Sequence, residues 1–168
     1  MSKVEPARES LKNILRVERM TEHDLLEVVE IEEMCGLSRW GWEAYHAELQ
    51  SGHAGLMLVL RRQQPAPATA PDKRLAGFVA SRLMADELHI NNIAVRPAFR
   101  RQGFAHVLLD RVLQEGAVAG AREALLEVRA SNKAAQALYQ RHDFRVAGRR
   151  RNYYAQPAED ALVMRATL

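Results

Sequence analysis

Two polar side chains in the second half of the sequence could together move protons. Glu127 interrupts an apolar strand pattern, and on the two-residue period of a strand it shares a face with Arg129, opposite Leu126 and Val128. Tyr139 follows on a short predicted helix. A carboxylate can accept a proton and a phenol can donate one. Each also has an ordinary alternative: a solvated glutamate on a strand face, and a tyrosine packed at the edge of the core.

The helix that carries Tyr139 is predicted to run from Asn132 to about Arg141, with Ser131 as its N-cap. Asn132 stands at its start, where its amide could hydrogen-bond a ligand or assist Ser131 in capping the helix.

An earlier segment, from Asn92 to Ala105, combines the end of a strand, a basic turn with a glycine and the start of a helix, an arrangement that suits an anion. Its first residues close an apolar strand, and Pro97 then stops strand pairing because it has no N–H. Arg100 and Arg101 add positive charge, and Gly103 lets a ligand approach the main chain just before a predicted helix begins. The unpaired N–H groups of a first helical turn favour anions. The run therefore predicts phosphate binding, or else an ordinary strand–helix turn with solvated arginines.

Two common phosphate motifs do not fit, since this turn has one glycine and no lysine. The form Arg100-x-x-Gly103-x-Ala105 resembles instead the coenzyme A pyrophosphate loop of GNAT acetyltransferases. The resemblance extends through Asn91–Val95, Leu126–Tyr139 and Arg150–Tyr154, and over roughly residues 14 to 166. These segments are similar to the RimI family, the bacterial ribosomal-protein-alanine N-acetyltransferases of the GNAT superfamily.

By position, the resemblance implies Glu127 as the proton acceptor and Tyr139 as the proton donor. It implies acetyl-CoA as co-substrate, the N-terminal segment of a small-subunit ribosomal protein as partner, and the GNAT fold. Trp40 and Trp42 lie where the family has a tryptophan-bearing loop beside the peptide entrance. The residues implied to bind the cofactor are Ile93, Ala94, Val95, Arg100, Arg101, Gln102, Gly103, Phe104, Ala105, His106, Asn132 and Tyr139.

The sequence departs from the family pattern in three places, none of which touches Glu127, Asn132 or Tyr139. Ala105 replaces the commoner second glycine of the loop. The segment 141–144 has Asp143 before Phe144 where Gly-Phe is usual, so the turn after the Tyr139 helix is expected to differ. The proline-rich segment 61–74 is longer than typical.

The implied reaction suits these residue types. An amine attacks a thioester only when it is neutral, and an α-amino group has a pKa of about 8 against about 10.4 for lysine. An N-terminal target is therefore favoured, with other N-termini or lysine side chains as alternatives. A GNAT-fold module that only senses acyl-CoA is a further alternative, although such a binder needs neither Glu127 nor Tyr139.

Composition sets the frame for this chemistry. The 168 residues, 48% of them hydrophobic, fit one globular domain over 13–168 after a loose tail, 1–12. Cys35 is the sole cysteine, and there is no signal peptide or apolar run of spanning length, which predicts a cytoplasmic protein without a membrane partner. The six histidines show no ligand spacing, so no metal is expected. Arg149–Arg151 are expected beside the substrate cleft or on a solvated edge rather than on RNA.

The elements that must position these residues can be read from periodicity. Helices are predicted after Thr21 as far as Cys35, around Trp42 to Leu49, from Ala105 onward, and over 132–141. Strands are predicted over 14–19, 55–60, 75–84, 88–95, 124–128, 144–147 and 161–164, with residues 149–157 between the last two strands or partly within them. The fold class is mixed α/β (α+β), with a partly antiparallel central sheet flanked by helices.

Overall fold

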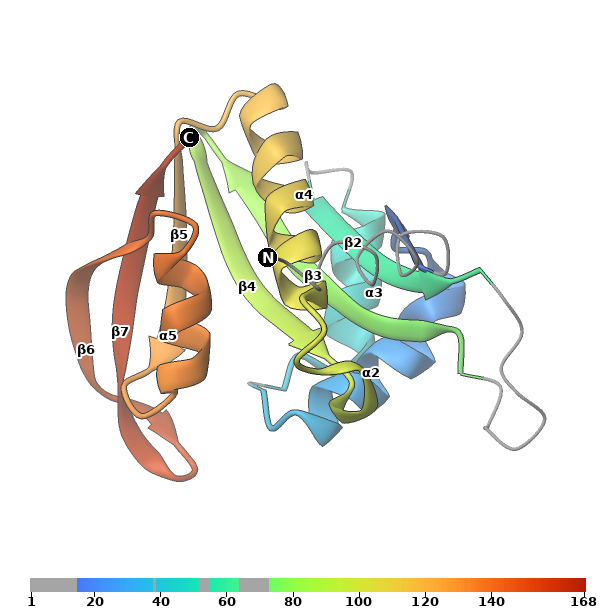
Figure 1. Cartoon of the computed structure of the whole chain (residues 1–168), viewed down its shortest axis with the longest axis horizontal. Coiled ribbons are helices and arrows are strands. Elements are labelled where there is room, and N and C mark those ends of the chain that lie inside the picture. The colour runs from blue at the N-terminus through green and yellow to red at the C-terminus, as the bar shows by residue number, and fades with distance from the viewer. Residues whose placement is uncertain (1–14, 38, 52–54, 64–72) are drawn as a thin grey trace, which may run out of the picture.

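The computed structural model describes residues 15–37, 39–51, 55–63 and 73–168 (Figure 1). The predicted tail, 1–12, and most of the predicted loop, 61–74, lie outside the described residues. The strands are β1 (Leu15–Arg19), β2 (Gly55–Arg62), β3 (Leu75–Met84), β4 (Glu87–Val95), β5 (Glu123–Arg129), β6 (Arg145–Ala155) and β7 (Ala158–Thr167). The helices are α2 (Leu25–Met34), α3 (Gly41–Gln50), α4 (Phe104–Val118) and α5 (Lys133–Gln140), with short 3-10 turns η1 (Glu22–Asp24) and η2 (Pro97–Phe99).

One seven-stranded sheet runs in the order β1-β2-β3-β4-β5-β7-β6. Every neighbouring pair is antiparallel except β4 and β5, which are parallel and joined through α4. The predicted mixed α/β class with a partly antiparallel sheet is confirmed.

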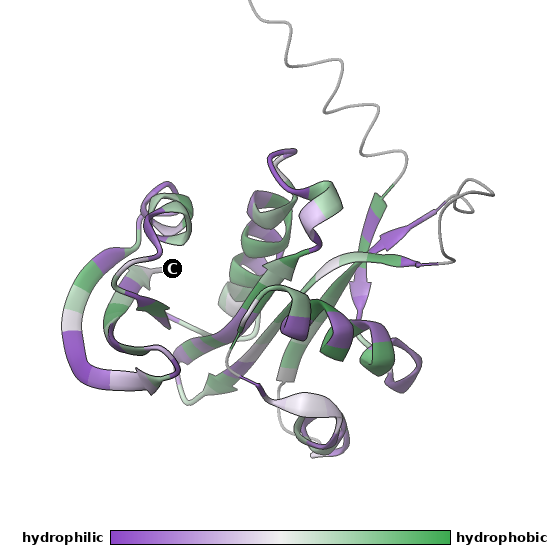
Figure 2. Ribbon diagram, turned by 90° about the horizontal axis from the view of Figure 1, so that it is seen from below, coloured by the Kyte–Doolittle hydropathy of each residue, from purple (hydrophilic) through white to green (hydrophobic). Residues whose placement is uncertain are grey.

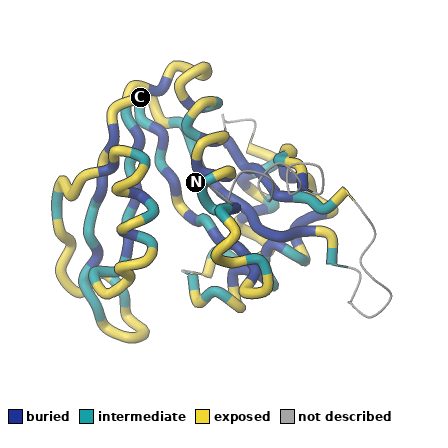
Figure 3. The backbone as a smooth tube through the Cα atoms, viewed as in Figure 1, coloured by how far each residue is buried: buried dark blue, intermediate teal, exposed yellow. Residues whose placement is uncertain are grey.

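Helices cover both faces of this sheet, with α4 and α5 on one side and α2 and α3 on the other (Figures 1 and 2). The apolar face predicted for α4 is confirmed, since Leu108, Leu109 and Val112 are fully buried. On the other side, α2 buries Val28 and Ile31. Figure 3 shows the buried backbone running through the central strands, while the outermost strand, β6, is exposed along most of its length. Among the described residues, no helix is both long and apolar enough to cross a bilayer.

The ends of α4 follow the predicted chemistry. Pro97 lies two residues after the end of β4, and Gly103 precedes α4 with a φ of 84°, a conformation that glycine adopts without strain. At the other end, Gly120 has a φ of 103°, and the N–H of Ala121 donates to the carbonyl of Gly116 (2.9 Å). This is the Schellman arrangement, which satisfies carbonyls left open at a helix end.

Two local predictions are wrong. Asn132, not Ser131, caps α5, because its side chain accepts a hydrogen bond from the N–H of Ala135 (3.0 Å). The bounds 144–147 and 161–164 of the last two strands are also too short, and of the two predicted places for residues 149–157 the structure favours the second, because β6 extends to Ala155. Antiparallel pairing between β6 and β7 carries the polar segment Arg149–Ala155 into a strand, although its sequence has no strand-like alternation.

The close packing of β3 against β4 generates a stability prediction. A methyl group added at Gly77 would lie 2.5 Å from the main-chain oxygen of Ala94, which cannot rotate away. Gly77→Ala should therefore lower the free energy of unfolding by about 1 to 3 kcal/mol, as measured by urea denaturation. Gly148→Ala is the matched control, since its nearest neighbour would be Val163 at 3.9 Å. Equal stability of the two variants would contradict the packing described.

Candidate functional site

The site is built on a separation between the two parallel strands. β4 and β5 pair only from Glu87–Glu123 to Ile90–Leu126, yet β4 continues to Val95 and β5 to Arg129. The separation begins at a bulge, because the register of β4 against β3 jumps from Ile90 to Asn92 and leaves Asn91 as an extra residue. A bulge bends its strand. Ile93, Ala94 and Val95 therefore pair with β3 on one side and have no register partner on β5 on the other.

Glu127 is the first residue of β5 beyond the last β4 pair. The burial of β5 alternates, with Leu126 and Val128 buried and Glu127 half-buried on the opposite face, which confirms the predicted period. Its Oε1 lies 2.8 Å from the Nε of Arg150. Hydrogen bonding to Glu127 is also the largest cause of a raised pKa at Tyr153.

A pocket of about 230 Å³ opens where the two strands part. It is lined from all sides of the gap by Trp40, by His89, Ile90 and Asn91 of β4, by Leu125, Leu126 and Glu127 of β5, by Arg150, Tyr153 and Tyr154 of β6, and by Val163 of β7. Of the two predicted entrance tryptophans, only Trp40 lines it. Trp42 is exposed and stacks on His46, with ring centroids 4.5 Å apart.

A larger hollow, of about 570 Å³, lies elsewhere, beside the C-terminal half of α4 together with Arg19 and Leu56. None of the residues predicted to bind a cofactor or to move protons lines it. The smaller pocket at Glu127 is therefore the candidate site.

Arg129 fixes the β6–β7 hairpin against β5. Its guanidinium donates to the main-chain oxygens of Gln156 (3.0 Å) and Pro157 (3.2 Å), and pairs with Glu159 (3.3 Å). It also lies over the ring of Tyr154, 4.1 Å from the centroid. The residue that shares a face with Glu127 thus holds the wall of the pocket in position.

Tyr139 lies on α5, is buried, and packs against Phe144 with ring centroids 5.9 Å apart. Burial raises the pKa of its phenol, and the neighbouring Tyr154 raises it further. The hydroxyl therefore stays protonated well above neutral pH and can donate a proton. Tyr139 does not line the pocket at Glu127. Tyr154 lines it and is near enough to Tyr139 to raise the pKa of that phenol.

The start of α5 is tied to the end of β5. The buried amide of Gln136 donates to the main-chain oxygens of Arg129 (3.1 Å) and Ala130 (2.9 Å). These bonds set the position of the helix relative to Glu127. Asn132 is exposed at the same helix start, with its side-chain oxygen engaged as the cap.

The predicted pyrophosphate loop lies between η2 and α4. Arg101 has a φ of 64° and Gly103 one of 84°, so the chain turns twice through the left-handed region before the helix. The first intrahelical bond runs from Val107 to the carbonyl of Gly103 (3.2 Å), which leaves the amides of Phe104 and Ala105 without acceptors inside the helix. Such an arrangement suits an anion.

Some side chains of this loop are exposed to solvent, and others contact the rest of the fold. Arg101 and Gln102 are exposed, whereas Phe104 is buried and meets Phe99 edge to face. The guanidinium of Arg100 turns back to β4, where it donates to the carbonyl of Val95 (3.1 Å) and contacts the sulfur of Cys35 (3.1 Å).

His106 stacks on His142, with Nδ1 and Nε2 2.9 Å apart. The other ring nitrogen of His142, Nδ1, lies 3.1 Å from Asp110.

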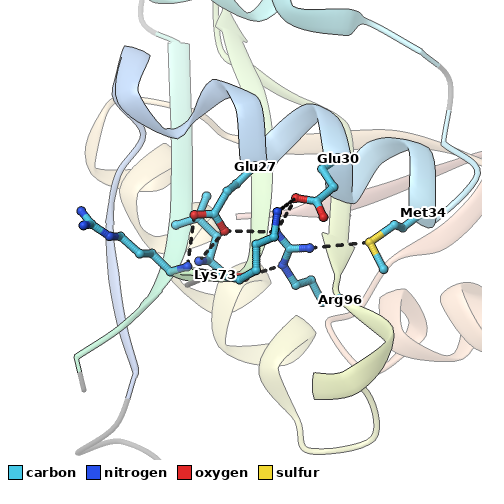
Figure 4. Close-up of polar contacts among 7 residues, drawn as sticks. Glu27, Glu30, Met34, Lys73 and Arg96 are labelled. Carbon is cyan, nitrogen blue, oxygen red and sulfur yellow. Dashed lines mark hydrogen bonds and ion pairs between the residues drawn. The ribbon is translucent and has the colours of Figure 1, made fainter. Parts of the chain in front are cut away.

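Arg96 anchors the loop to α2 (Figure 4). It is buried, and its guanidinium donates to the carbonyl of Leu75 (2.8 Å) and to the carboxylates of Glu27 (3.0 Å) and Glu30 (3.2 Å). Lys73 adds a second cation 2.6 Å from Glu30 and, with Arg96, lowers the pKa of that carboxyl. The loop thus begins from a fixed point.

Comparison with known proteins agrees with this architecture. The family described as the acetyltransferase (GNAT) family matches residues 25–144. The chain belongs to the GNAT acetyltransferase family. Similar to it is a putative [ribosomal protein bS18]-alanine N-acetyltransferase of Bacillus subtilis, 32% identical over 94% of this chain and 99% of the relative.

Two further similar proteins are one that matches over part of its length and one whose crystal structure is known. The [ribosomal protein bS18]-alanine N-acetyltransferase of Salmonella typhimurium is 45% identical over 55% of this chain and 64% of its own length. The crystal structure of the ribosomal-protein-S18-alanine N-acetyltransferase from Escherichia coli superposes with a TM-score of 0.77 at 30% identity, covering 92% of this chain and 94% of that one. The predicted resemblance is confirmed.

A buried carboxylate that we did not predict supports the α2 side of this GNAT site. Glu32 accepts hydrogen bonds from the main-chain N–H groups of Trp40 (2.8 Å) and Gly41 (3.0 Å), from the hydroxyl of Tyr45 (2.8 Å) and from the amide of Asn92 (3.2 Å). It thereby fixes the segment that carries Trp40 against β4.

The sequence held a signal for Glu32, because it lies four residues after Val28 and next to Ile31 on the apolar face of α2. A charged residue on such a face is buried only with partners. Asn91 and Asn92, two consecutive polar residues inside an apolar strand, were the corresponding signal for the bulge.

The Glu32 network gives a second prediction. In Glu32→Gln, an amide NH₂ group would face N–H donors that now meet an oxygen, so buried donors lose their acceptor. The free energy of unfolding should fall by about 1 to 3 kcal/mol. Glu33→Gln, on the exposed neighbour, should stay within about 0.5 kcal/mol of the wild type. A wild-type urea midpoint for Glu32→Gln would contradict the network.

Proposed function

We propose that this chain transfers acetyl from acetyl-CoA to the α-amino group of the N-terminal alanine of a small-subunit ribosomal protein. The relatives named for this activity on bS18 support the substrate, one of them over nearly the full length of both chains. The observation that carries the proposal is the opening of a pocket at Glu127 where β4 leaves β5. The proposed location is the cytoplasm, where ribosomal proteins are made.

Acetyl-CoA, in this proposal, lies along the free edge of β4. The backbone of Ile93, Ala94 and Val95 lacks partners on β5 and suits the amide groups of the acyl arm. The pyrophosphate lies on the loop of Arg100, Arg101, Gln102, Gly103, Phe104, Ala105 and His106, where the first turn of α4 offers main-chain N–H groups. The remaining proposed contacts to acetyl-CoA come from Asn132, the N-cap of α5, and from Tyr139 on α5.

The chemistry is a direct attack in a ternary complex. Glu127, directly or through a water, removes the proton from the substrate ammonium, since only the neutral amine is nucleophilic. A main-chain N–H on the Val95 strand is the donor for the oxyanion that forms at the thioester carbonyl. As the carbon–sulfur bond breaks, the Tyr139 hydroxyl supplies the proton that the CoA thiolate takes up. Burial keeps that hydroxyl protonated, because it raises the pKa of Tyr139.

An assay of peptides tests the substrate class. With acetyl-CoA, the N-terminal peptide of bS18 should be acetylated on its α-amino group, whereas a lysine peptide with a blocked N-terminus should react far more slowly, because its amine is mostly protonated. Mass spectrometry locates the acetyl group. Transfer to the blocked lysine peptide alone would overturn the N-terminal proposal, and no transfer to any peptide despite CoA binding would overturn the enzymatic one.

Variants test the proposed roles. Glu127→Gln and Tyr139→Phe should each lower kcat by about 10²- to 10⁴-fold, the range of general acid–base catalysis, with little change in CoA affinity. Glu123→Gln is the control, because Glu123 lies on the same face of β5 at its paired end, with Arg165 as its partner (3.0 Å). Collapse of CoA binding with unchanged turnover of the loaded enzyme would show that the roles are wrong.

A further inference from the structure

The ion pair between Arg150 and Glu127 points to a second role for the β6 strand. We propose that Arg150 is an internal competitor for the amine subsite: its guanidinium occupies the Glu127 carboxylate until the α-ammonium group of the substrate displaces it. This inference rests on the proposed function, since it takes Glu127 as the group that meets the substrate amine.

The contact is made where the substrate nitrogen must arrive. The Nε of Arg150 lies 2.8 Å from Oε1 of Glu127, and both residues line the pocket. A guanidinium and an ammonium are both cations that donate N–H bonds to carboxylate oxygens. They therefore compete for the same acceptor, and the exchange of one for the other leaves the charge at the carboxylate balanced.

Arg150 is attached weakly enough to be exchanged. Its side chain is 59% exposed, and it lies on the outermost strand of the sheet. The β6–β7 register is irregular between Arg150 and Tyr154, so residues 151–153 have no register partner on β7, and regular pairing resumes at Tyr154. Exposed ion pairs contribute little, because water and salt screen them.

Arg129, on the same face of β5 as Glu127, shows the contrast. Its guanidinium is held by two main-chain oxygens, by Glu159 and by the ring of Tyr154, and its side chain is 25% exposed. Of the two arginines beside the pocket, one is fixed in the structure and the other is held by one carboxylate and the nearby ring of Tyr153 (5.5 Å). Only the second is suited to leave.

The exchange distinguishes substrate from product. A free N-terminus carries a positive charge and can replace Arg150 at Glu127. After transfer the nitrogen is an uncharged amide, which cannot, so Arg150 regains the carboxylate as the product leaves. Arg150 therefore weakens binding of the free-amine substrate, whereas binding of the acetylated product does not depend on it.

The test is calorimetric titration of the CoA-bound enzyme with an Ala-starting peptide and with the same peptide N-acetylated. Arg150→Ala should bind the free-amine peptide about twofold to fivefold more tightly, the fold-change expected for loss of an exposed ion pair, and the acetylated peptide unchanged. Arg151→Ala is the matched control, an exposed neighbour on the same strand that does not line the pocket, and should bind both peptides as the wild type does.

Two further measurements test whether the tighter peptide binding of Arg150→Ala depends on the Glu127 carboxylate. The gain should vanish in Glu127→Gln/Arg150→Ala compared with Glu127→Gln alone. Added methylguanidinium should weaken binding of the free-amine peptide to Arg150→Ala, in competition with the peptide.

Weaker binding of the free-amine peptide by Arg150→Ala, or an equal gain for both peptides, would overturn the proposal while leaving acetyl transfer intact. Failure of the proposed function would appear separately, as absence of transfer by the wild type.

Discussion

The parting of β4 from β5 after the Ile90–Leu126 pair is the constraint on which the rest of the site depends. Two parallel strands of one sheet would ordinarily use all their facing backbone groups on each other. Here the bulge at Asn91 bends β4 away, and the next residue of β5 is Glu127. Residues 93–95, which have no register partner on β5, and the Glu127 carboxylate thereby lie on the two strands that part. The proposed division between cofactor and acceptor rests on that geometry.

Buried charges hold the β4 side of the opening. Arg96 fixes the start of the loop to α2, and Glu32 fixes the Trp40 segment to the same helix and to Asn92. Each is almost fully buried and satisfied by several partners, so loss of a single partner would leave a desolvated charge uncompensated. On the β6–β7 side, Arg129 fixes the hairpin, but β6 is exposed along most of its length and Arg150 meets Glu127 in a single ion pair. The proposed cofactor side is therefore rigid, whereas on the proposed peptide side the Arg150 side chain can be exchanged.

Local periodicity predicted much of this structure. The buried face of α4, the placement of Glu127 opposite the buried face of β5 and the end of β4 just before Pro97 depend on near neighbours in sequence, and all are confirmed. Whether residues 149–155 belong to a strand was left open by the sequence, because pairing with β7, not their own polar pattern, places them in β6. The parting of the strands and the hydrogen bond from Asn92 to Glu32 arise between segments far apart in the chain, which periodicity cannot relate. The roles of Glu127, Tyr139 and the loop remain predictions from the resemblance.

Hydrogen exchange of the main-chain amides, with and without acetyl-CoA, tests the central claim most directly, because it reports protection residue by residue. Acetyl-CoA should slow exchange over residues 91–95 of β4 and over 101–106 of the loop and the first turn of α4. The C-terminal half of α4, 111–119, beside the larger hollow, should exchange as before. Protection confined to 111–119, with 91–95 unchanged, would contradict a cofactor site between the parted strands.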